Sequence, residues 1–185
     1  MFMNKNRIVE KDQVVKKETI ENINNIVLSE SFSYVLSNEK PLNNFLNKKY
    51  KTDSTIQMVH VLYKKEPMYK STYFTPFYNL FNEIVHNVIK KDTELLRMKV
   101  NFLFPKTNKK INNFHKDSIN IKNYKSMVYY VNDSDGDTVV YNNKLYKIKP
   151  KAGKIVYFNG DLFHASNNPI KFSSRIVVNI NYKDA

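Results

Sequence analysis

Apolar residues recur at helical spacing through the first half of the chain. Residues 18–32 place their apolar side chains near one helical face, with Thr19 as the candidate N-cap. Residues 76–91 carry a broad apolar stripe that predicts a longer helix packed on a sheet, and residues 41–48 predict a short helix that begins at a proline. We therefore expect residues 1–95 to be mainly helical.

The period of the pattern falls from about 3.6 residues to about 2 residues in the second half. Short runs rich in β-branched and aromatic residues are separated there by Gly, Asn, Asp and Pro. These runs cover residues 97–104, 125–131, 138–141, 154–158 and 175–182. Residues 57–63 form a similar run that would join a sheet edge. Helices followed by many short strands indicate an α+β protein, in which helices cover one side of a β-sandwich or barrel.

The length of 185 residues fits a single domain with one core. We expect residues 1–95 to support that core and residues 96–185 to form it and to carry any active site. No apolar run reaches the roughly 18 residues that cross a bilayer, and the N-terminal residues lack the apolar stretch of a secretory signal. We therefore expect a soluble, cytoplasmic protein. The absence of cysteine excludes disulfides, thiolate zinc sites and a catalytic cysteine.

The formal net charge of +13 would suit nucleic acid, an acidic protein or an anionic membrane face as a partner. Nearly all of this charge is lysine, because Arg7, Arg97 and Arg175 are the only arginines. Sites that read phosphate usually enlist arginine for its planar fork of donors. Abundant Lys, Asn, Ile and Tyr together are typical of an AT-rich genome, such as that of a bacteriophage or a low-GC microbe. The charge alone therefore does not identify a partner.

The segment His115-Lys116-Asp117 carries the candidate chemistry. In an extended chain, residues two positions apart point to the same side, so His115 and Asp117 can present an imidazole and a carboxylate to one point. His164 is the best candidate for a third ligand from a distant strand. Two histidines and one carboxylate on one face of a metal ion leave open positions opposite, the arrangement diagnostic of non-haem Fe(II) oxygenases.

A His-x-Asp tripeptide is common by chance, but the motifs that follow it occur in a specific order. The first two are Met127-Val128-Tyr129-Tyr130-Val131-Asn132 and Asp135-Gly136-Asp137-Thr138. The run from Pro150 to Phe158, which contains Gly153, comes next. His164 follows it, and Arg175 comes eleven positions after His164. This order resembles the 2-oxoglutarate- and Fe(II)-dependent dioxygenase superfamily, and within it the prolyl-hydroxylase-like branch with its small phage-encoded members.

In that branch an aromatic-rich strand follows the His-x-Asp pair, and an Asp-Gly turn follows the strand. A Pro-x-x-Gly-x-x-x-x-Phe strand then leads to the distal histidine and a basic residue. The resemblance covers residues 97–182, and the sequence departs from the frequent Asp-Gly-Gly turn by placing Asp137 at the second glycine. It implies a double-stranded β-helix (jelly-roll, cupin-like) core, with Fe(II) held by the catalytic residues His115, Asp117 and His164.

The resemblance also implies a site for 2-oxoglutarate as cosubstrate. Chelation of iron through its 2-oxo and C1 carboxylate groups leaves the C5 carboxylate for Arg175, whose guanidinium offers charge and two parallel hydrogen bonds. Tyr130 is expected to offer its phenol to the same carboxylate. Alternation from Arg175 puts Asn179 on the pocket face, with Asn181 a further candidate, and Asn101 is expected to contribute a polar group from the preceding strand.

These residues predict an enzyme that uses O2 and 2-oxoglutarate to hydroxylate a second substrate. The resemblance favours a prolyl or other peptidyl side chain. A nucleic-acid base and a small metabolite are the alternative substrates, and a non-catalytic metal-binding jelly roll that acts as an interaction module is the alternative class. Zinc or another divalent ion could take the place of Fe(II), because affinity alone does not favour iron. The sequence gives no oligomeric state.

Overall fold

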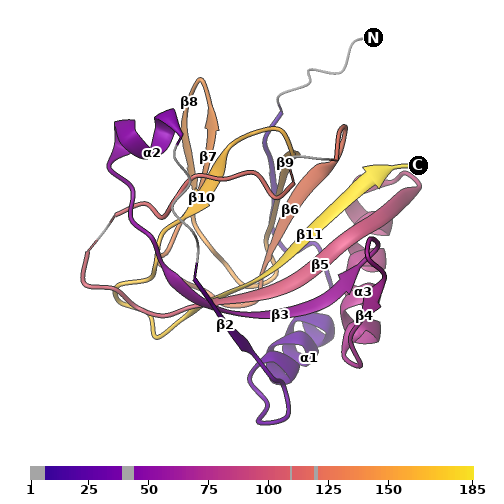
Figure 1. Ribbon diagram of the computed structural model, residues 1–185. Helices are drawn as coiled ribbons and strands as arrows, with labels where there is room; N and C mark the ends of the chain where they lie inside the picture. The colour runs from indigo at the N-terminus through magenta and orange to yellow at the C-terminus, as the bar shows by residue number, and fades with distance from the viewer. Residues whose placement is uncertain (1–6, 39–43, 109, 119–120) are drawn as a thin grey trace.

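Two antiparallel sheets face each other in the computed structural model, which describes residues 7–38, 44–108, 110–118 and 121–185 (Figure 1). The large sheet has the order β1 (Val9–Lys11), β9 (Ile155–Asn159), β6 (Lys125–Tyr130), β11 (Arg175–Asp184), β5 (Thr93–Leu103), β3 (Ile56–Lys64) and β2 (Val35–Asn38), with β4 (Tyr69–Lys70) paired to β3. The small sheet has the order β10 (His164–Ser166), β7 (Thr138–Asn142) and β8 (Lys144–Ile148).

The chain passes back and forth between the two sheets. It runs from β6 in the large sheet to β7 and β8 in the small one, returns through β9, crosses again to β10 and ends in β11. This alternation between facing sheets makes the core a double-stranded β-helix, as the sequence predicts.

The side chains of β11 show how the strands divide the interior. Ile176, Val178, Ile180 and Tyr182 all belong to the core between the large sheet and the helices. Val177 belongs instead to the apolar cluster between the two sheets, together with Val128 and Val140. Because alternate residues of a strand point to opposite faces, Arg175, Asn179 and Asn181 share the inner face with Val177.

Helices cover the outer face of both sheets. α1 (Lys17–Val27) and α3 (Phe74–Ile84), which continues as a π-helical turn η1 (Val85–Ile89), lie against the large sheet (Figure 1). α2 (Phe45–Tyr50) covers the small sheet, where its buried Leu46 packs in one cluster with residues of β7 and β10. None of the described helices is long and apolar enough to span a bilayer.

The described residues confirm the predicted strands to within a few residues at their ends, and they correct the predicted helices. The predicted helix over residues 76–91 begins at Phe74 and ends in the π-helical turn. Residues 41–43 of the predicted helix over 41–48 lie outside the described residues, and α2 begins at Phe45 with Asn44 as its N-cap.

Thr19 is not an N-cap, because α1 begins two residues before it. Glu83 of α3 takes the capping role instead: its carboxylate accepts hydrogen bonds from the Lys16 backbone N–H and the Thr19 hydroxyl, both at 2.7 Å. A carboxylate at a helix N-terminus satisfies an otherwise unpaired donor and interacts favourably with the helix dipole. The cap therefore comes from tertiary structure.

Residues 1–95 also contribute more strand than the sequence predicts. The strands β1 to β4 and the start of β5 all belong to the large sheet, so this half of the chain extends the β core as well as covering it. The strands β1, β2 and β4 are short, and both β2 and β4 lie at the margin of the sheet. Such short strands carry little of the periodicity that a sequence pattern needs.

Phe77 provides a test of the packing between α3 and the large sheet. Its side chain is fully buried in this core. Phe77→Ala should lower the free energy of unfolding by about 3–5 kcal/mol, because it removes buried area and leaves a cavity. Asn82→Ala, on the exposed face of the same helix, should change it by less than about 0.5 kcal/mol. Urea denaturation monitored by circular dichroism measures both, and equal losses would contradict this packing.

Candidate metal centre and its surroundings

His115 and His164 lie directly opposite each other on neighbouring antiparallel segments. The His115 N–H donates to the His164 carbonyl at 2.9 Å, and the His164 N–H donates to the His115 carbonyl at 3.0 Å. A residue pair that exchanges both backbone hydrogen bonds projects its side chains to the same face of the ladder. The two imidazole centroids accordingly lie 4.6 Å apart.

Backbone carbonyls orient both imidazole rings in the same way. The Nδ1 atom of His115 lies 3.1 Å from the carbonyl oxygen of Asn113, and that of His164 lies 3.2 Å from the carbonyl oxygen of Leu162. A carbonyl accepts, so each Nδ1 carries a proton and each Nε2 is left to face the other ligand atoms, the side from which a metal ion would be bound. The ring of Phe158 lies 5.1 Å from that of His164 and limits its rotation.

Asp117 completes the group, and two polar side chains hold its carboxylate. Oδ2 of Asp117 accepts from the Ser126 hydroxyl at 2.8 Å and from the Asn181 amide at 2.9 Å. Ser126 and Asn181 are themselves opposite residues of β6 and β11. The two donors come from adjacent strands of the large sheet, so they fix the orientation of a carboxylate that the His115 segment supplies.

The three side chains offer a donor set for a divalent cation. Their ligand atoms all lie within 4.8 Å of one another, and the Asp117 side chain is only 3% exposed. Burial would raise the pKa of Asp117, but the neighbouring His164 holds it well below its usual range, so the carboxylate is ionised. Burial and then the charge of His164 lower the pKa of His115 to about 4, so its imidazole is neutral. Burial lowers the pKa of His164, but the neighbouring Asp117 carboxylate outweighs that effect and raises the pKa overall, so a bound cation would displace the Nε2 proton. Two imidazoles and one carboxylate fit Fe(II).

Tyr124 joins the two segments that carry these ligands. Its hydroxyl donates to the Gly160 carbonyl at 2.9 Å and accepts from the Ser118 N–H at 3.0 Å. A Cβ on Gly160 would come within 2.2 Å of the Tyr124 ring, so glycine is required there for the ring to pack. Tyr124 thereby holds the residue after Asp117 against the turn that precedes His164.

Arg175 is buried on the inner face of β11, at the first residue of the strand. The turn Asp135-Gly136-Asp137-Thr138 supplies its hydrogen-bond acceptors. Its Nε donates to the Gly136 carbonyl and one terminal nitrogen donates to the Thr138 hydroxyl, both at 2.7 Å. The Tyr130 hydroxyl donates to the same Thr138 oxygen at 2.7 Å, and burial raises the pKa of Tyr130 to about 12, so the phenol stays protonated. Arg175 also lies over the Tyr130 ring, 5.9 Å from its centroid.

Gly136 leaves room for this arginine. A Cβ there would lie 2.5 Å from the Asn167 carbonyl oxygen and 3.0 Å from Cδ of Arg175. The preceding Asp135 accepts from the backbone N–H groups of Ile170 and Lys171, at 2.9 and 3.0 Å, and so fixes the loop that leads to β11. Asp137 stands where the Asp-Gly-Gly turn has its second glycine, and the contacts of Asp135 and Gly136 form with Asp137 in that place.

The remaining predicted residues line the same interior at different depths. Asn101 of β5 stands opposite Val177, and its amide donates to the Gln57 side chain at 2.6 Å. Asn179 is half-buried and stands opposite Lys99 and Val128. The structure thus brings Asn101 and Asn179 to the inner face that carries Arg175. Their role at a cosubstrate remains a prediction.

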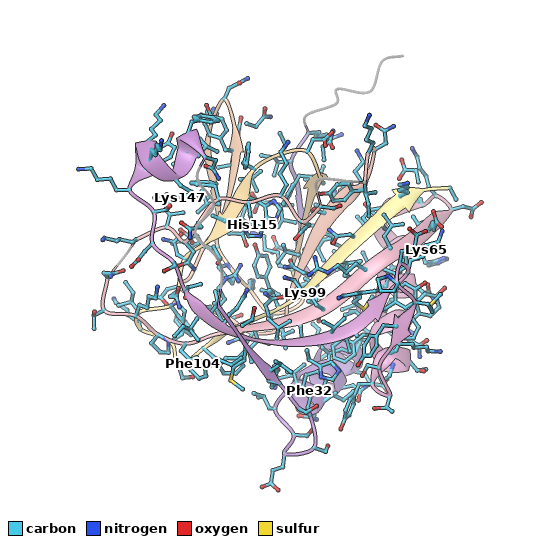
Figure 2. The ribbon with its side chains drawn as sticks, viewed as in Figure 1. Phe32, Lys65, Lys99, Phe104, His115 and Lys147 are labelled. Carbon is cyan, nitrogen blue, oxygen red and sulfur yellow. The ribbon has the colours of Figure 1, made fainter. Side chains whose placement is uncertain are left out.

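Several residues of the site were missed by the sequence reasoning. Thr138 belongs to a recognised motif, yet only the structure shows that it joins Arg175 to Tyr130. Ser126 is the second residue of a predicted strand and has no feature that marks it as a partner of Asp117. Lys99 stands two positions from Asn101, and its charge is one of several that act on the pKa values of His115, Asp117 and His164. Alternation along β5 could have found Lys99, and Figure 2 shows it near the middle of the molecule, below His115.

No protein-family model matches the sequence, and no curated protein matches it. Solved structures do match over almost the whole chain. An oxidoreductase of the 2OG-Fe(II) oxygenase family from Burkholderia pseudomallei matches with a TM-score of 0.70 at 10% identity, over 97% of this chain and 85% of that one. The fold is that of the 2-oxoglutarate- and Fe(II)-dependent oxygenases.

Two further structures come from prolyl hydroxylases. A Trichoplax adhaerens enzyme in complex with a hypoxia inducible factor peptide matches with a TM-score of 0.66 at 14% identity, over 98% of this chain and 85% of that one. The viral collagen prolyl hydroxylase of Paramecium Bursaria Chlorella virus-1, solved with 2OG, matches with a TM-score of 0.50 at 15% identity, over 96% of both chains. These likenesses confirm the predicted double-stranded β-helix.

The donors to Asp117 can be tested through metal affinity. Asn181→Ala should weaken Zn(II) binding roughly 10–100-fold in the absence of cosubstrate, because it frees the ligating carboxylate to rotate. Asn179→Ala removes an amide from the same face of the same strand, two positions away, and should leave this affinity unchanged. Competition with a chromophoric chelator measures both constants, and equal effects of the two substitutions would refute the positioning role of Asn181.

Proposed function

We propose that this chain is an Fe(II)- and 2-oxoglutarate-dependent dioxygenase that acts as a single domain over residues 1–185. One observation carries the proposal: a two-histidine, one-carboxylate donor set and a buried arginine occupy the same space between the two sheets. A metal-binding jelly roll without catalysis would need only the donor set. The buried guanidinium has the chemistry to bind an acid at this depth, which a dicarboxylate cosubstrate provides.

The position of Arg175 along the small sheet suits a short dicarboxylate. Val140 of β7 stands opposite His164, and Thr138, which holds Arg175, lies two residues further along the same strand. Two residues of a strand span about 7 Å. This separation supports a cosubstrate that reaches from the metal ligands to the guanidinium. Tyr130 is the proposed second donor to its C5 carboxylate, and Asn179 and Asn101 are the proposed polar lining.

The residues of the chain would then divide the work between them. His115, Asp117 and His164 would hold Fe(II) on one face, and Ser126 and Asn181 would keep the carboxylate in its ligating orientation. The iron, with 2-oxoglutarate, would supply the activation of O2, so that 2-oxoglutarate and O2 yield succinate, carbon dioxide and a hydroxylated substrate. Apolar residues of the inner cluster, such as Val140 and Phe158, exclude water from this reaction.

A prolyl or other peptidyl side chain is the proposed second substrate. The support comes from the two prolyl hydroxylases, one of them solved with a peptide, whose fold this chain shares. It also comes from the order of the motifs around His115, which resembles the prolyl-hydroxylase-like branch. A peptide library examined by mass spectrometry for the gain of one oxygen tests this part of the proposal.

Succinate formation tests the activity itself. The iron-loaded protein should convert 2-oxoglutarate to succinate, and His115→Ala or Asp117→Ala should abolish this conversion, because each removes a ligand. Arg175→Gln should weaken 2-oxoglutarate binding roughly 10–100-fold and leave metal binding intact, because it removes a charge-assisted pair of hydrogen bonds. Succinate quantified by NMR and calorimetric binding of 2-oxoglutarate measure the two effects.

Arg7→Gln is the matched control, since Arg7 is exposed on the surface. It should change neither measurement. A folded, iron-loaded protein that neither binds nor turns over 2-oxoglutarate would support the interaction module instead. Unchanged 2-oxoglutarate affinity in Arg175→Gln would refute the assignment of that residue alone.

Thr138 provides a finer test of how the arginine is positioned. Thr138→Val keeps the shape of the side chain but removes the acceptor shared by Arg175 and Tyr130, so we expect about tenfold weaker 2-oxoglutarate binding and unchanged Zn(II) binding. Thr138→Ser keeps the hydroxyl and should retain most of the affinity. If valine and serine behaved alike in calorimetric titrations, the hydroxyl would have no part in holding Arg175.

A further inference from the structure

A cleft opens beside Asp117 at the end of the barrel away from Arg175. It encloses about 340 Å³, and Asp117 and Asn181 form part of its wall. Arg175 and Tyr130 do not line it. The inner face of β5 runs between these two places: Leu103 stands opposite Arg175, and Arg97 stands opposite Asn181. The cleft therefore reaches the donor set at Asp117, on the side away from Arg175.

Basic side chains dominate the charged wall of this cleft. Lys64, Lys65, Arg97 and Lys183 line it together with Glu66 and Glu94. Lys65 is hydrogen-bonded to Glu94, and these two charges offset each other. Lys64, Arg97 and Lys183 remain with Glu66 and with Asp117, whose carboxylate faces the proposed cation, so the wall carries a small positive excess.

Arg97 stands in a polar row that crosses the large sheet. Lys64 of β3 is opposite Arg97 of β5, Arg97 is opposite Asn181 of β11, and Asn181 is opposite Ser126 of β6. The last two members of the row hold Asp117. Lys64 and Arg97 are like charges directly across a strand pair, an arrangement that is unfavourable unless an anion lies between them.

The backbone of the large sheet is irregular on both sides of Arg97. In the pairing with β11, Leu96 is an extra residue of β5 between the partners of Asn181 and Tyr182. In the pairing with β3, Leu62 is an extra residue between Val61 and Tyr63. Bulges of this kind re-aim side chains and are over-represented beside active sites. Here they flank Arg97, and Lys64, Arg97 and Asn181 of its row line the cleft.

The guanidinium of Arg97 has donor capacity to spare. Its Nε is buried and has no hydrogen-bond partner among the described residues, and no carboxylate of the described residues forms an ion pair with it. A buried donor without an acceptor is unfavourable, and a guanidinium fork matches a carboxylate or a phosphate. Lys99, next along the inner face, extends the positive potential inward to the triad.

We propose that the second substrate carries an acidic group, a carboxylate or a phosphate, which Arg97 binds in this cleft with Lys64 as the supporting cation. The proposal rests on the proposed function and narrows its substrate class. The volume of the cleft fits a small molecule or one side chain of a peptide, with the acidic group held at the Asn181 end of β5. The carbon to be hydroxylated then lies between that group and the metal ligands.

Turnover with matched pairs of compounds tests the substrate class. The library pairs each carboxylic acid with its carboxamide and each phosphate monoester with its alcohol, and succinate formation is measured with the iron-loaded protein. The acidic members should stimulate succinate formation. Comparison of the carboxylic acids with the phosphate monoesters identifies which acidic group is preferred. Arg97→Gln should lower kcat/KM for the acidic substrate roughly 10–100-fold, Arg97→Lys should lose less, and Arg7→Gln should lose nothing. Neutral members that stimulate equally well in wild type and in Arg97→Gln would overturn the proposal.

A binding measurement keeps this inference separate from the proposed function. The zinc-loaded protein with 2-oxoglutarate is titrated with N-acetylaspartate or N-acetylasparagine, and with glycerol 3-phosphate or glycerol, while the Nε–H resonance of Arg97 is followed by NMR. The acids should shift it and the neutral partners should not. An unmoved Nε–H resonance would overturn the inference even if the enzyme turned over 2-oxoglutarate. A shift by the acids in a protein that never binds 2-oxoglutarate would keep the acid site at Arg97 but refute the proposed function, and with it the assignment of that acid to a second substrate.

Discussion

Two backbone hydrogen bonds between His115 and His164 set the geometry on which the site depends. They join segments that are forty-nine positions apart in the chain, and they do so as a directly opposed antiparallel pair. Once that register is fixed, both imidazoles project to one face, and Asp117 follows on the same side because it lies two residues from His115. A slip of one residue would send one imidazole to the outer face and leave no donor set. Tyr124 reinforces this register by tying the segments together beyond the ligands.

Buried charge is the second constraint, and the two ends of the barrel meet it differently. Asp117 is buried as an anion, and it is satisfied by Ser126, Asn181 and the neighbouring imidazole. Arg175 is buried as a cation, and neutral acceptors, the Gly136 carbonyl and the Thr138 hydroxyl, hold it in place. The Asp137 carboxylate belongs to the same turn: its burial raises its pKa, and nearby positive charges, Arg175 among them, act against that rise. The buried guanidinium is therefore held by neutral hydrogen-bond acceptors with a carboxylate close by.

Much of the fold and of the metal centre could be predicted from the sequence, because both depend on strict local periods. A period of two residues locates the long strands and places His115 and Asp117 on one side, and the order of the motifs selects His164. The strand β10 escapes this reasoning because it has only three residues. Thr19 fails as a cap because Glu83, which caps α1, is distant in sequence. Ser126, Thr138 and Arg97 acquire their roles only from the strand register, which no local pattern specifies.

The inner face of β5 shows how one strand can serve both ends of such a barrel. Its alternate residues from Leu103 to Arg97 pass from the Arg175 end to the cleft beside Asp117, and they change from apolar to amide to cationic. The Arg175 end is closed by packing, since Gly136 has no room even for a Cβ. The Arg97 end is bulged and opens into the cleft, where Asp117 and Asn181 share the wall with Arg97. Under the proposed function, β5 would face the cosubstrate at one end and the second substrate at the other. The charge of Arg97, rather than the net charge of the whole surface, would then govern substrate recognition.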